Sequence, residues 1–542
     1  MEIIKNKKFN LPDFRFLFDR PILPYLIIAF GIAMRLIQYL ANRSLWADEA
    51  VLALNIVNRS YLELLQPLDY DQGAPIGFLI VEKLAVQILG NNEYALRLFP
   101  FVCGVGSLFL FYELGKKLIP KSSIIISLTL FASLPYLVYY SAELKQYSSD
   151  VAIALFLYLL LLPLLQEKLN RSQIIKYSLV GAIAIWFSHP SIFILASLGG
   201  SALLINFWQK YLNKVKHLLL IYSAWIVSFG IFYFVSLRNL TGNETLTTSW
   251  GSGFPSSPFD IIWMLDAFGK FFYKPLGFSK WVDGLAIVLF LLGCISCWLS
   301  RKKNLLLLLS PLFMTFLASF LHQYPFRSRL VLFLIPYVIF LIAEGGSYLL
   351  TKSKSRPIKF ISIFLTILLP KEILTESVSY LLTKSKSRPI KFISIFLIIL
   401  LLIQPLTKAI DLIEEPLNYS DIKPVLSYIK KHQQPGDILY IYQRGIYQFQ
   451  YYAEKYGYQE GDYIIGVDDL DKYDGQELSI TEMTRYEKDL DKLRGNKRVW
   501  LLFSHTHIPA ERRFLNYYLN EIGLRIDTFE KPGSYVYLYD MS

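Results

Sequence analysis

The sequence is poor in charged residues and in cysteine for a chain of its length. Only 18% of its 542 residues are Asp, Glu, Lys or Arg, whereas soluble globular proteins contain about 25%. A chain made of several soluble domains is therefore excluded. Cys103, Cys294 and Cys297 all lie in apolar segments, which excludes a disulfide scaffold and favours packing over metal binding. Residues 1–20 are polar and charged, so we expect no cleavable signal peptide.

Long apolar runs take the place of soluble domains. Hydrophobic residues make up 54% of the chain, and they are grouped into segments close to the ~20 residues that cross a bilayer as a helix. The sequence therefore predicts a polytopic α-helical membrane protein with about 11 transmembrane helices. The expected spans are 21–40, 95–115, 122–140, 149–165, 174–188, 190–207, 217–236, 283–299, 304–321, 330–350 and 390–406.

The net charge of +12 is divided unevenly along the chain. Residues 1–407 carry 38 basic and 21 acidic side chains, a net charge of +17, whereas 408–542 carry 17 and 22, a net of −5. The basic excess thus belongs to the membrane part. We therefore expect contacts with membrane lipids and no nucleic-acid partner.

Most basic residues between the spans lie in alternate loops, which the positive-inside rule assigns to the cytoplasm. We place the protein in the plasma (inner) membrane on this basis. The opposite, outer side then receives the first loop 41–94, the long loop 237–281 and three short turns, at 141–148, 188–189 and 322–329.

One segment occurs twice. SYLLTKSKSRPIKFISIFL is found at 347–365 and again, unchanged, at 379–397, which indicates a recent tandem duplication rather than a solenoid. The first copy has only a short apolar stretch, 360–369, before a charged segment, too short for a normal span. We expect it to lie along the inner leaflet, so that 390–406 crosses the membrane and the tail stays outside.

Residues 408–542 have a different pattern. Strand patterns at 437–442, 497–503 and 534–540 alternate with helical patterns at 421–434, 445–457 and 511–523. This alternation predicts a small C-terminal α/β domain. Because the tail follows the last span, we expect the domain on the extracytoplasmic side.

The first outer loop begins with two adjacent carboxylates, Asp48 and Glu49, just after Trp46. Such a pair at a membrane surface suits a general base with its helper, or a divalent-cation site. It also suits the solvated start of a helix, with Asp48 as N-cap. The pair alone does not decide between these alternatives, and the metal remains unknown.

The continuation of this loop resembles the GT-C glycosyltransferases. In particular, it looks like the branch that contains dolichyl-phosphate-mannose–protein mannosyltransferases and bacterial aminoarabinose transferases. The resemblance rests on three elements in order, Asp48–Glu49, Gly73–Ala74–Pro75 and the stretch Gly90…Glu93…Arg97–Leu98–Phe99–Pro100. It covers roughly residues 20–350. The resemblance implies that Asp48 is the catalytic base.

Basic residues in two outer turns oppose the positive-inside bias, which favours phosphate contacts over anchoring in lipid headgroups. Lys145 and Tyr147 precede one span and resemble the family's second outer motif, while Arg327 and Arg329 precede another. We expect these four residues to bind the phosphate of a lipid-linked donor, whose leaving charge needs cations and hydrogen-bond donors.

Several other polar residues are weaker candidates. Glu143 borders the second outer motif, and His189 lies in the outer turn 188–189, so both are possible substrate-binding residues. His505 and His507 follow a strand of the tail. Two histidines do not make a metal site, and we interpret them as an ordinary turn at a strand end.

The sequence therefore predicts an inverting glycosyltransferase. It would move a sugar from a polyprenyl-phosphate-linked donor to an acceptor hydroxyl, on a protein, lipid or glycan, at the outer face of the membrane, with a divalent cation as a possible cofactor. A non-enzymatic flippase or transporter of polyprenyl-linked lipids is the alternative, but it should carry ionisable residues at mid-membrane. A polysaccharide ligase or polymerase would not require the Asp48–Glu49 loop.

Overall fold

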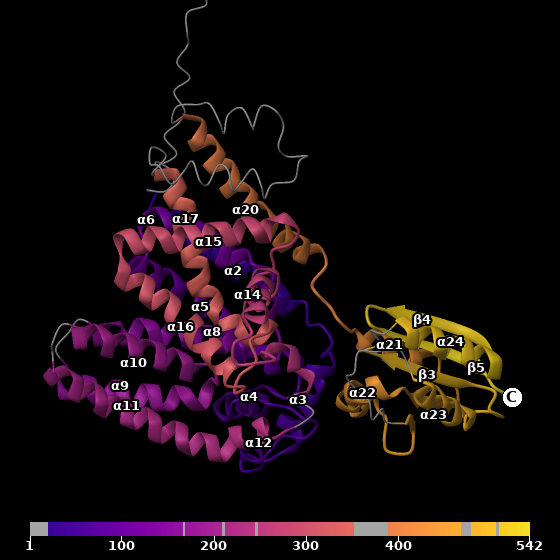
Figure 1. The fold of residues 1–542 in the computed structure, drawn as a ribbon. Helices are drawn as coiled ribbons and strands as arrows, with labels where there is room; N and C mark the ends of the chain where they lie inside the picture. The colour runs from indigo at the N-terminus through magenta and orange to yellow at the C-terminus, as the bar shows by residue number, and fades with distance from the viewer. Residues whose placement is uncertain are drawn as a thin grey trace, which may run out of the picture.

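The computed structural model contains a helical membrane part and an α/β domain beside it, joined by a linker after α20 (Figure 1). It describes residues 20–165, 169–208, 212–243, 248–351, 388–467, 479–505 and 509–542. Residues 352–365 of the first duplicated copy, the apolar stretch 360–369 and His507 lie outside the described residues. The expected position of that copy along the inner leaflet therefore stays a prediction.

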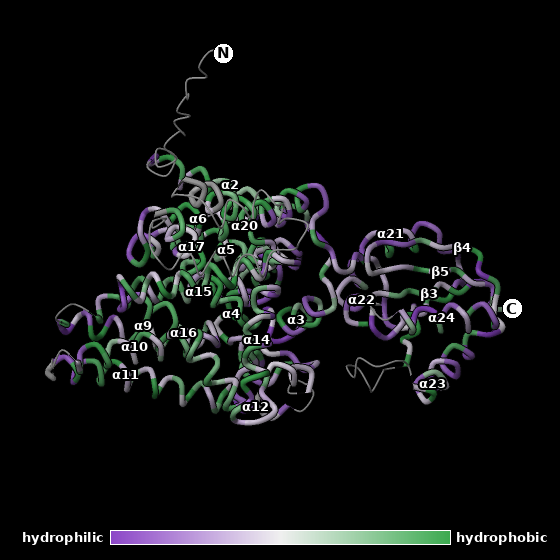
Figure 2. Tube along the Cα trace, turned by 45° about the horizontal axis from the view of Figure 1, so that its top comes forward, coloured by the Kyte–Doolittle hydropathy of each residue, from purple (hydrophilic) through white to green (hydrophobic). Residues whose placement is uncertain are grey.

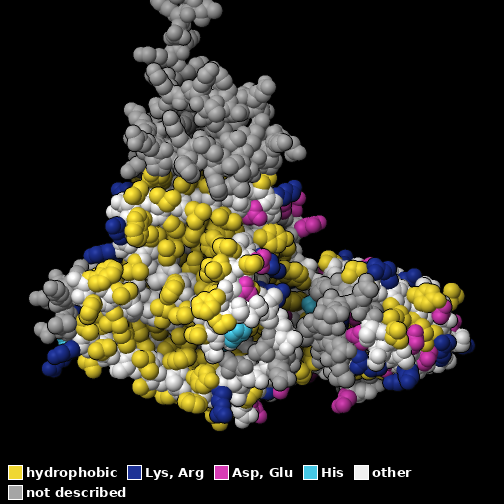
Figure 3. Space-filling view, viewed as in Figure 1, with side chains coloured by type: hydrophobic (Ala, Val, Ile, Leu, Met, Phe, Trp, Pro, Cys, Tyr) yellow, Lys and Arg dark blue, Asp and Glu magenta, His cyan; other side chains and the backbone are white. Residues whose placement is uncertain are grey.

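The polytopic helical architecture is confirmed. Within the described residues, nine helical segments are long and apolar enough to cross a membrane. They are Leu23–Leu40 (α2), Glu93–Leu118 (α5), Tyr147–Leu165 (α8 and a 3₁₀ turn), Ser191–Trp208 (α10), Lys214–Leu240 (within α11 to α12), Trp281–Ser300 (α15), Lys302–Phe320 (α16), Ser328–Leu350 (a 3₁₀ turn and α17) and Ser394–Glu414 (within α20, Arg388–Glu414). Hydrophobic residues dominate these helices and cover much of the surface of the helical part (Figures 2 and 3).

The two remaining expected spans form shorter helices, α6 (Lys121–Ser133) and α9 (Arg171–Phe187). The span expected at 122–140 is broken, because Leu134 has an extended conformation before Pro135 and a separate short helix, α7 (Pro135–Tyr140), follows. The residue before a proline is disfavoured in the helical region. Pro135 therefore explains the break, and the single span expected at 122–140 is wrong.

The most buried helix of the membrane part is α17, which crosses α15 at two glycines. A Cβ added to Gly293 would lie 1.9 Å from the carbonyl oxygen of Leu341, and one added to Gly345 would lie 1.9 Å from that of Leu289. Small residues of this kind let two membrane helices approach closely. This crossing fixes the position of α17, whose preceding turn carries Arg327 and Arg329.

The loops 41–94 and 237–281 contain helices, of which the sequence analysis foresaw only one, as the alternative of a helix start at Asp48. The first loop forms α3 (Ala47–Asn58) and α4 (Ile76–Leu89), and the long loop forms α14 (Ile261–Tyr273). Helix α3 begins at Ala47, and its N-cap is Trp46 rather than Asp48. Asp48 is therefore already inside the first turn of α3.

The C-terminal domain is a five-stranded mixed sheet in the order β2-β1-β3-β5-β4. Its strands are β1 (Ile438–Ile441), β2 (Ile464–Ile465), β3 (Val499–Ser504), β4 (Leu524–Lys531) and β5 (Ser534–Asp540). Helices α21 (Ile422–His432) and α22 (Ile446–Ala453) pack on one face, and α23 (Ile480–Asp491) and α24 (Pro509–Ile522) on the other. The α/β prediction is confirmed, although β2, β4 and α23 were not expected.

The C-terminal domain is anchored to the start of the membrane part by buried polar contacts. The Tyr452 hydroxyl donates to Glu93 at 2.8 Å and accepts the N–H of Leu45 at 2.9 Å. Gln448 donates to the Leu45 carbonyl at 2.7 Å, and Lys423 forms an ion pair with Glu93 at 2.9 Å. These contacts hold the sheet next to residues 43–49, where the candidate site begins.

Candidate active site

A cavity of about 410 Å³ lies where the C-terminal domain meets the ends of several membrane helices. Its walls come from the N-cap of α3, from α7 and the turn after it, and from the long loop 237–281. The turn before α17, the linker after α20 and the residue that follows β3 complete them. The lining residues are Trp46, Tyr139, Tyr140, Glu143, Ser249, Trp250, Lys274, Arg327, Ser328, Arg329, Tyr419 and His505.

Asp48 is held at this cavity by two cations. Arg329 donates a hydrogen bond from Nη2 to Asp48 Oδ2, and Lys145 Nζ lies 3.7 Å from Oδ1. Burial alone would raise the pKa of Asp48, but the charges of Arg329 and Lys145, with His505, lower it to about 2. Asp48 is therefore ionised at neutral pH, and both its oxygens face cations.

Glu49 does not line the cavity and is paired with Arg97. Arg97 donates to both carboxylate oxygens, at 2.8 Å from Nε and 2.6 Å from Nη2, and both side chains are almost fully buried. Glu49 also accepts the N–H of Leu144 at 2.7 Å. This geometry ties the start of α3 to the turn before α8, so Glu49 fits a positioning role better than the predicted catalytic one.

Arg329 is surrounded by aromatic rings. Its guanidinium carbon lies 5.5 Å from the ring centre of Trp46 and 5.6 Å from those of Tyr147 and Trp250. Such rings attract a cation through their π-faces and shield it from water. Tyr147 is thus next to Arg329, as expected for two residues of one site.

Two further cations line the same cavity. Arg327 lies 5.9 Å from the Trp250 ring centre and donates to the Ser249 carbonyl at 3.4 Å. Lys274, which the sequence analysis did not select, has its pKa lowered by burial and then by the charges of Arg329 and Arg327. Three cations converging on one cavity make a site suited to an anion such as a phosphate.

Glu143 is a buried carboxyl in the cavity wall. Trp46 Nε1 donates to its Oε1 at 3.2 Å, and its Oε2 has no hydrogen-bond partner among the described residues. Burial raises the pKa of Glu143 above its ordinary 4.5, and the charges of Glu49 and Asp48 act in the same direction, against those of Arg329 and Arg43. A carboxyl of this kind in a cavity is a candidate for function.

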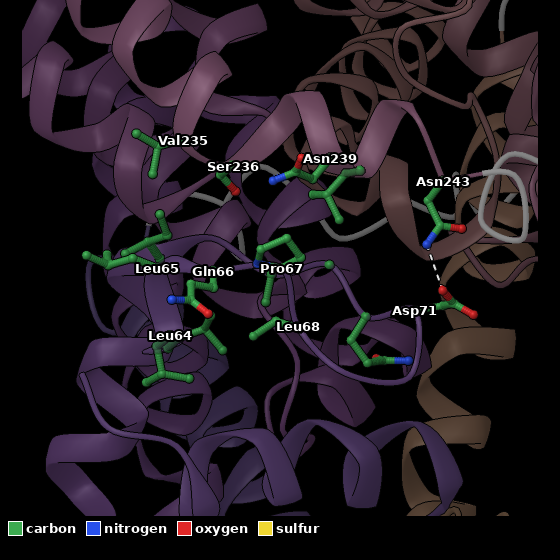
Figure 4. A pocket seen from close by; sticks show the side chains of 16 residues that line it. Leu64, Leu65, Gln66, Pro67, Leu68, Asp71, Val235, Ser236, Asn239 and Asn243 are labelled. Carbon is green, nitrogen blue, oxygen red and sulfur yellow. Dashed lines mark hydrogen bonds between the residues drawn. The ribbon is translucent and has the colours of Figure 1, made fainter. Parts of the chain in front are cut away.

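Lys145 is covered by the first outer loop. Its Nζ donates to Gln72 at 2.8 Å. On the other side of this loop a smaller cavity of about 50 Å³ separates it from the segment 235–243, and Asn243 donates to Asp71 across it at 2.7 Å (Figure 4). The first outer loop is therefore held between Lys145 and the start of the long outer loop.

The structure does not bring His189 to the cavity. His189 lies in the turn between α9 and α10, and its ring centre is 5.6 Å from that of Phe232. Burial lowers the pKa of His189 to about 4. A neutral, half-buried histidine there fits a structural role. The site thus brings together Asp48, Glu143, Lys145, Tyr147, Arg327 and Arg329, and leaves out Glu49 and His189.

Sequence reasoning did not select Trp250, Lys274 or Tyr419, and it interpreted His505 as part of an ordinary turn. Trp250 and Lys274 lie in a loop without a motif, and Tyr419 and His505 come from more than 80 positions beyond the last selected residue. Only the residue types could have pointed to these side chains as candidates for the site, because aromatic and titratable side chains are common in binding sites.

A divalent cation has no ready site at the two adjacent carboxylates. Within the described residues, no group of three or more His, Cys, Asp or Glu side chains converges. Both oxygens of Asp48 face cations, and Glu49 is bound to Arg97. Asp48 and Glu49 therefore do not form a cation site in this arrangement.

Comparisons with known proteins agree with this architecture. The family model of dolichyl-phosphate-mannose-protein mannosyltransferase matches residues 73–234, and no curated protein matches the chain significantly. ArnT from Cupriavidus metallidurans is similar in fold, with a TM-score of 0.51 in both its apo state and its undecaprenyl-phosphate-bound state. The identities are 11% and 12%, and each alignment covers 95% of this chain and 98% of ArnT. The resemblance seen in the sequence is thus confirmed by the family model over residues 73–234, and the fold of the chain is similar to that of ArnT.

Proposed function

We propose that this protein is a glycosyltransferase, which moves a sugar from a polyprenyl-phosphate-linked donor to an acceptor hydroxyl at the outer face of the plasma membrane. The observation that carries the proposal is the cavity itself. Arg327, Arg329 and Lys274 converge there beside the carboxylate of Asp48. An anion site next to a carboxylate is what transfer from a sugar phosphate to a hydroxyl requires.

The cations suit the donor half of the reaction. They lie at the ends of membrane helices, where a lipid tail can stay in the bilayer while its phosphate enters the cavity. When the bond between the sugar and the phosphate breaks, its electron pair goes to the phosphate oxygen, and the cations stabilise that charge. Arginine suits this task because its planar fork binds two phosphate oxygens at once. One of the ArnT structures of similar fold contains undecaprenyl phosphate.

Asp48 suits the acceptor half. The acceptor oxygen attacks the anomeric carbon from the side opposite the phosphate, inverts its configuration, and passes its proton to Asp48. In the free protein Asp48 is a weak base, because the ion pairs with Arg329 and Lys145 stabilise its ionised form. A donor phosphate competes for these cations, which leaves Asp48 more basic once the donor is bound.

Binding of the leaving group tests the proposal without knowledge of the sugar. Purified protein should bind one undecaprenyl phosphate in native mass spectrometry, and it should not bind undecaprenol, which lacks the phosphate. Arg329→Ala and Arg327→Ala should each weaken this binding about tenfold or more, the loss of one charge-assisted contact. Lys302→Ala, outside the cavity, is the matched control. Equal binding of undecaprenol, or unchanged binding by both arginine variants, would contradict the proposal.

A further inference from the structure

His505 directly follows β3 and belongs to the cavity wall, although it lies 457 positions after Asp48 in the chain. Its ring centre is 5.6 Å from that of Trp46, the residue whose indole also donates to Glu143. The side chain is half-buried, and its charge acts on Asp48. The C-terminal domain therefore contributes a titratable side chain to the same cavity as the membrane part.

The backbone at His505 has a conformation that calls for an explanation. Its φ is 59°, in the left-handed region where non-glycine residues are uncommon. The N–H of His505 donates to the carbonyl of Gly533 at 2.9 Å, which holds this conformation. A single residue held in this region suggests a functional constraint on where its side chain points.

The turn at Gly533 also holds Tyr419, the other cavity residue from this side. A Cβ on Gly533 would lie 2.0 Å from the carbonyl oxygen of Tyr419, so only glycine fits there. The Tyr419 ring centre lies 5.6 Å from that of Trp46. One turn between β4 and β5 thus positions both residues against Trp46.

The position of His505 relative to Asp48 is fixed by the docking of the whole domain. Glu93 on α5 binds both Lys423 and Tyr452, and Gln448 binds the carbonyl of Leu45, one residue before Trp46. The contacts are buried or partly buried, so they restrict motion of the domain against α3. His505 consequently has the fixed geometry that a substrate-binding side chain needs.

The two sides of the cavity differ in chemistry. Its cations, Arg327, Arg329 and Lys274, all come from the membrane part, whereas the C-terminal side provides Tyr419 and His505. A lipid-linked donor reaches the cavity from the membrane, so its phosphate meets the cations. This division leaves the side of the C-terminal domain, with Tyr419 and His505, for a hydroxyl-bearing acceptor.

We propose that His505 is an acceptor-positioning residue, whose imidazole forms a hydrogen bond with the acceptor and holds its hydroxyl beside Asp48. Tyr419 and Trp46 supply flat rings for the rest of the acceptor. This inference rests on the proposed glycosyl transfer, and it makes the C-terminal domain part of the active site.

The test separates acceptor positioning from donor binding. His505→Ala and His505→Asn are compared in cells and as purified proteins, with His322→Ala as the control. His322 also has a positive φ, of 54°, but it stacks on Phe254 and does not line the cavity. The two readouts are binding of undecaprenyl phosphate by native mass spectrometry, and the ratio of lipid-linked sugar to surface glycan by mass spectrometry of the cells.

His505→Ala should bind undecaprenyl phosphate within about twofold of the wild type, yet produce at least tenfold less glycan while the lipid-linked sugar accumulates. His505→Asn should recover part of the transfer, because asparagine tolerates positive φ and keeps hydrogen-bonding groups. Glycan levels equal to those of His322→Ala, or an asparagine variant as inactive as alanine, would overturn the inference. Failure of the wild type to bind undecaprenyl phosphate would instead refute the proposed function.

Discussion

Replacing Asp48 with asparagine should abolish sugar transfer and, at the same time, tighten the binding of a polyprenyl phosphate. In the free protein the Asp48 carboxylate occupies Arg329 and attracts Lys145, two cations that the phosphate of the donor must engage. Asparagine keeps the shape of the side chain and removes its charge. The phosphate then meets the cations without a competitor.

The size of the effect follows from the pKa of Asp48. Its neighbours lower that pKa from 3.8 to about 2 although burial opposes them, and one pKa unit corresponds to about 1.4 kcal/mol. The side chain is only 21% exposed, so water screens the interaction little. The net attraction is about 2 kcal/mol, and its loss should tighten undecaprenyl phosphate binding about tenfold or more. Transfer should fall by about 10²–10⁴-fold, as is typical when a general base is lost.

Titration of the purified variants with undecaprenyl phosphate at pH 7, followed by native mass spectrometry, measures this affinity. Asp71→Asn is the matched control, because it removes the same charge from the same outer loop, where Asp71 binds Asn243 outside the main cavity. An Asp48→Asn variant that binds no more tightly than Asp71→Asn would refute the idea that Asp48 competes with the phosphate. Retention of more than half of the wild-type transfer would show that Asp48 is not the base.

Other features give further predictions. Glu49→Gln breaks the buried pair with Arg97 and should destabilise the protein by about 3–5 kcal/mol, seen as a clear fall in its unfolding temperature in detergent; a stable but inactive variant would restore the catalytic role of Glu49. Glu143→Gln should gain stability relative to the wild type as the pH rises above 4.5, because folding raises the pKa of Glu143 and so disfavours its ionised form; a difference that does not vary with pH would contradict this. Gly293→Ala should prevent normal assembly of α15 on α17, whereas Gly284→Ala, with open space around its Cβ, should not; equal yields of folded protein would refute the packing argument. In a cysteine-free background, Thr528→Cys on the exposed face of β4 should react with a membrane-impermeant thiol reagent in intact cells, while the buried Ser534→Cys should not; labelling of Thr528→Cys only after permeabilisation would put the domain in the cytoplasm.

Much of the helical architecture was predictable because a bilayer demands about 20 apolar residues per span. All eleven expected segments are helical. The break near Leu134 was missed because hydropathy alone does not register the effect of Pro135 on the residue before it. In the C-terminal domain the buried strands β1, β3 and β5 were visible as apolar runs, whereas β4 is largely exposed and lacks such a run.

The site was predictable in part, for a physical reason. Lys145, Arg327 and Arg329 stood out because cations in outer turns oppose the usual charge bias. The pairing of Glu49 with Arg97 could not be foreseen, since it depends on how α3 packs against α5. His505 was named but assigned to an ordinary turn for the same reason, because only the docking of the C-terminal domain brings it to Trp46.

The most direct test of glycosyl transfer at this cavity compares the lipids and surface glycans of three cell populations by mass spectrometry. One makes the wild-type protein, one makes Asp48→Asn at the same membrane level, and one lacks the protein. We expect Asp48→Asn cells to accumulate a polyprenyl-phosphate-linked sugar. The glycan that is missing from cells without the protein should also be missing from the Asp48→Asn cells. Lipids and glycans identical in all three populations would contradict the account.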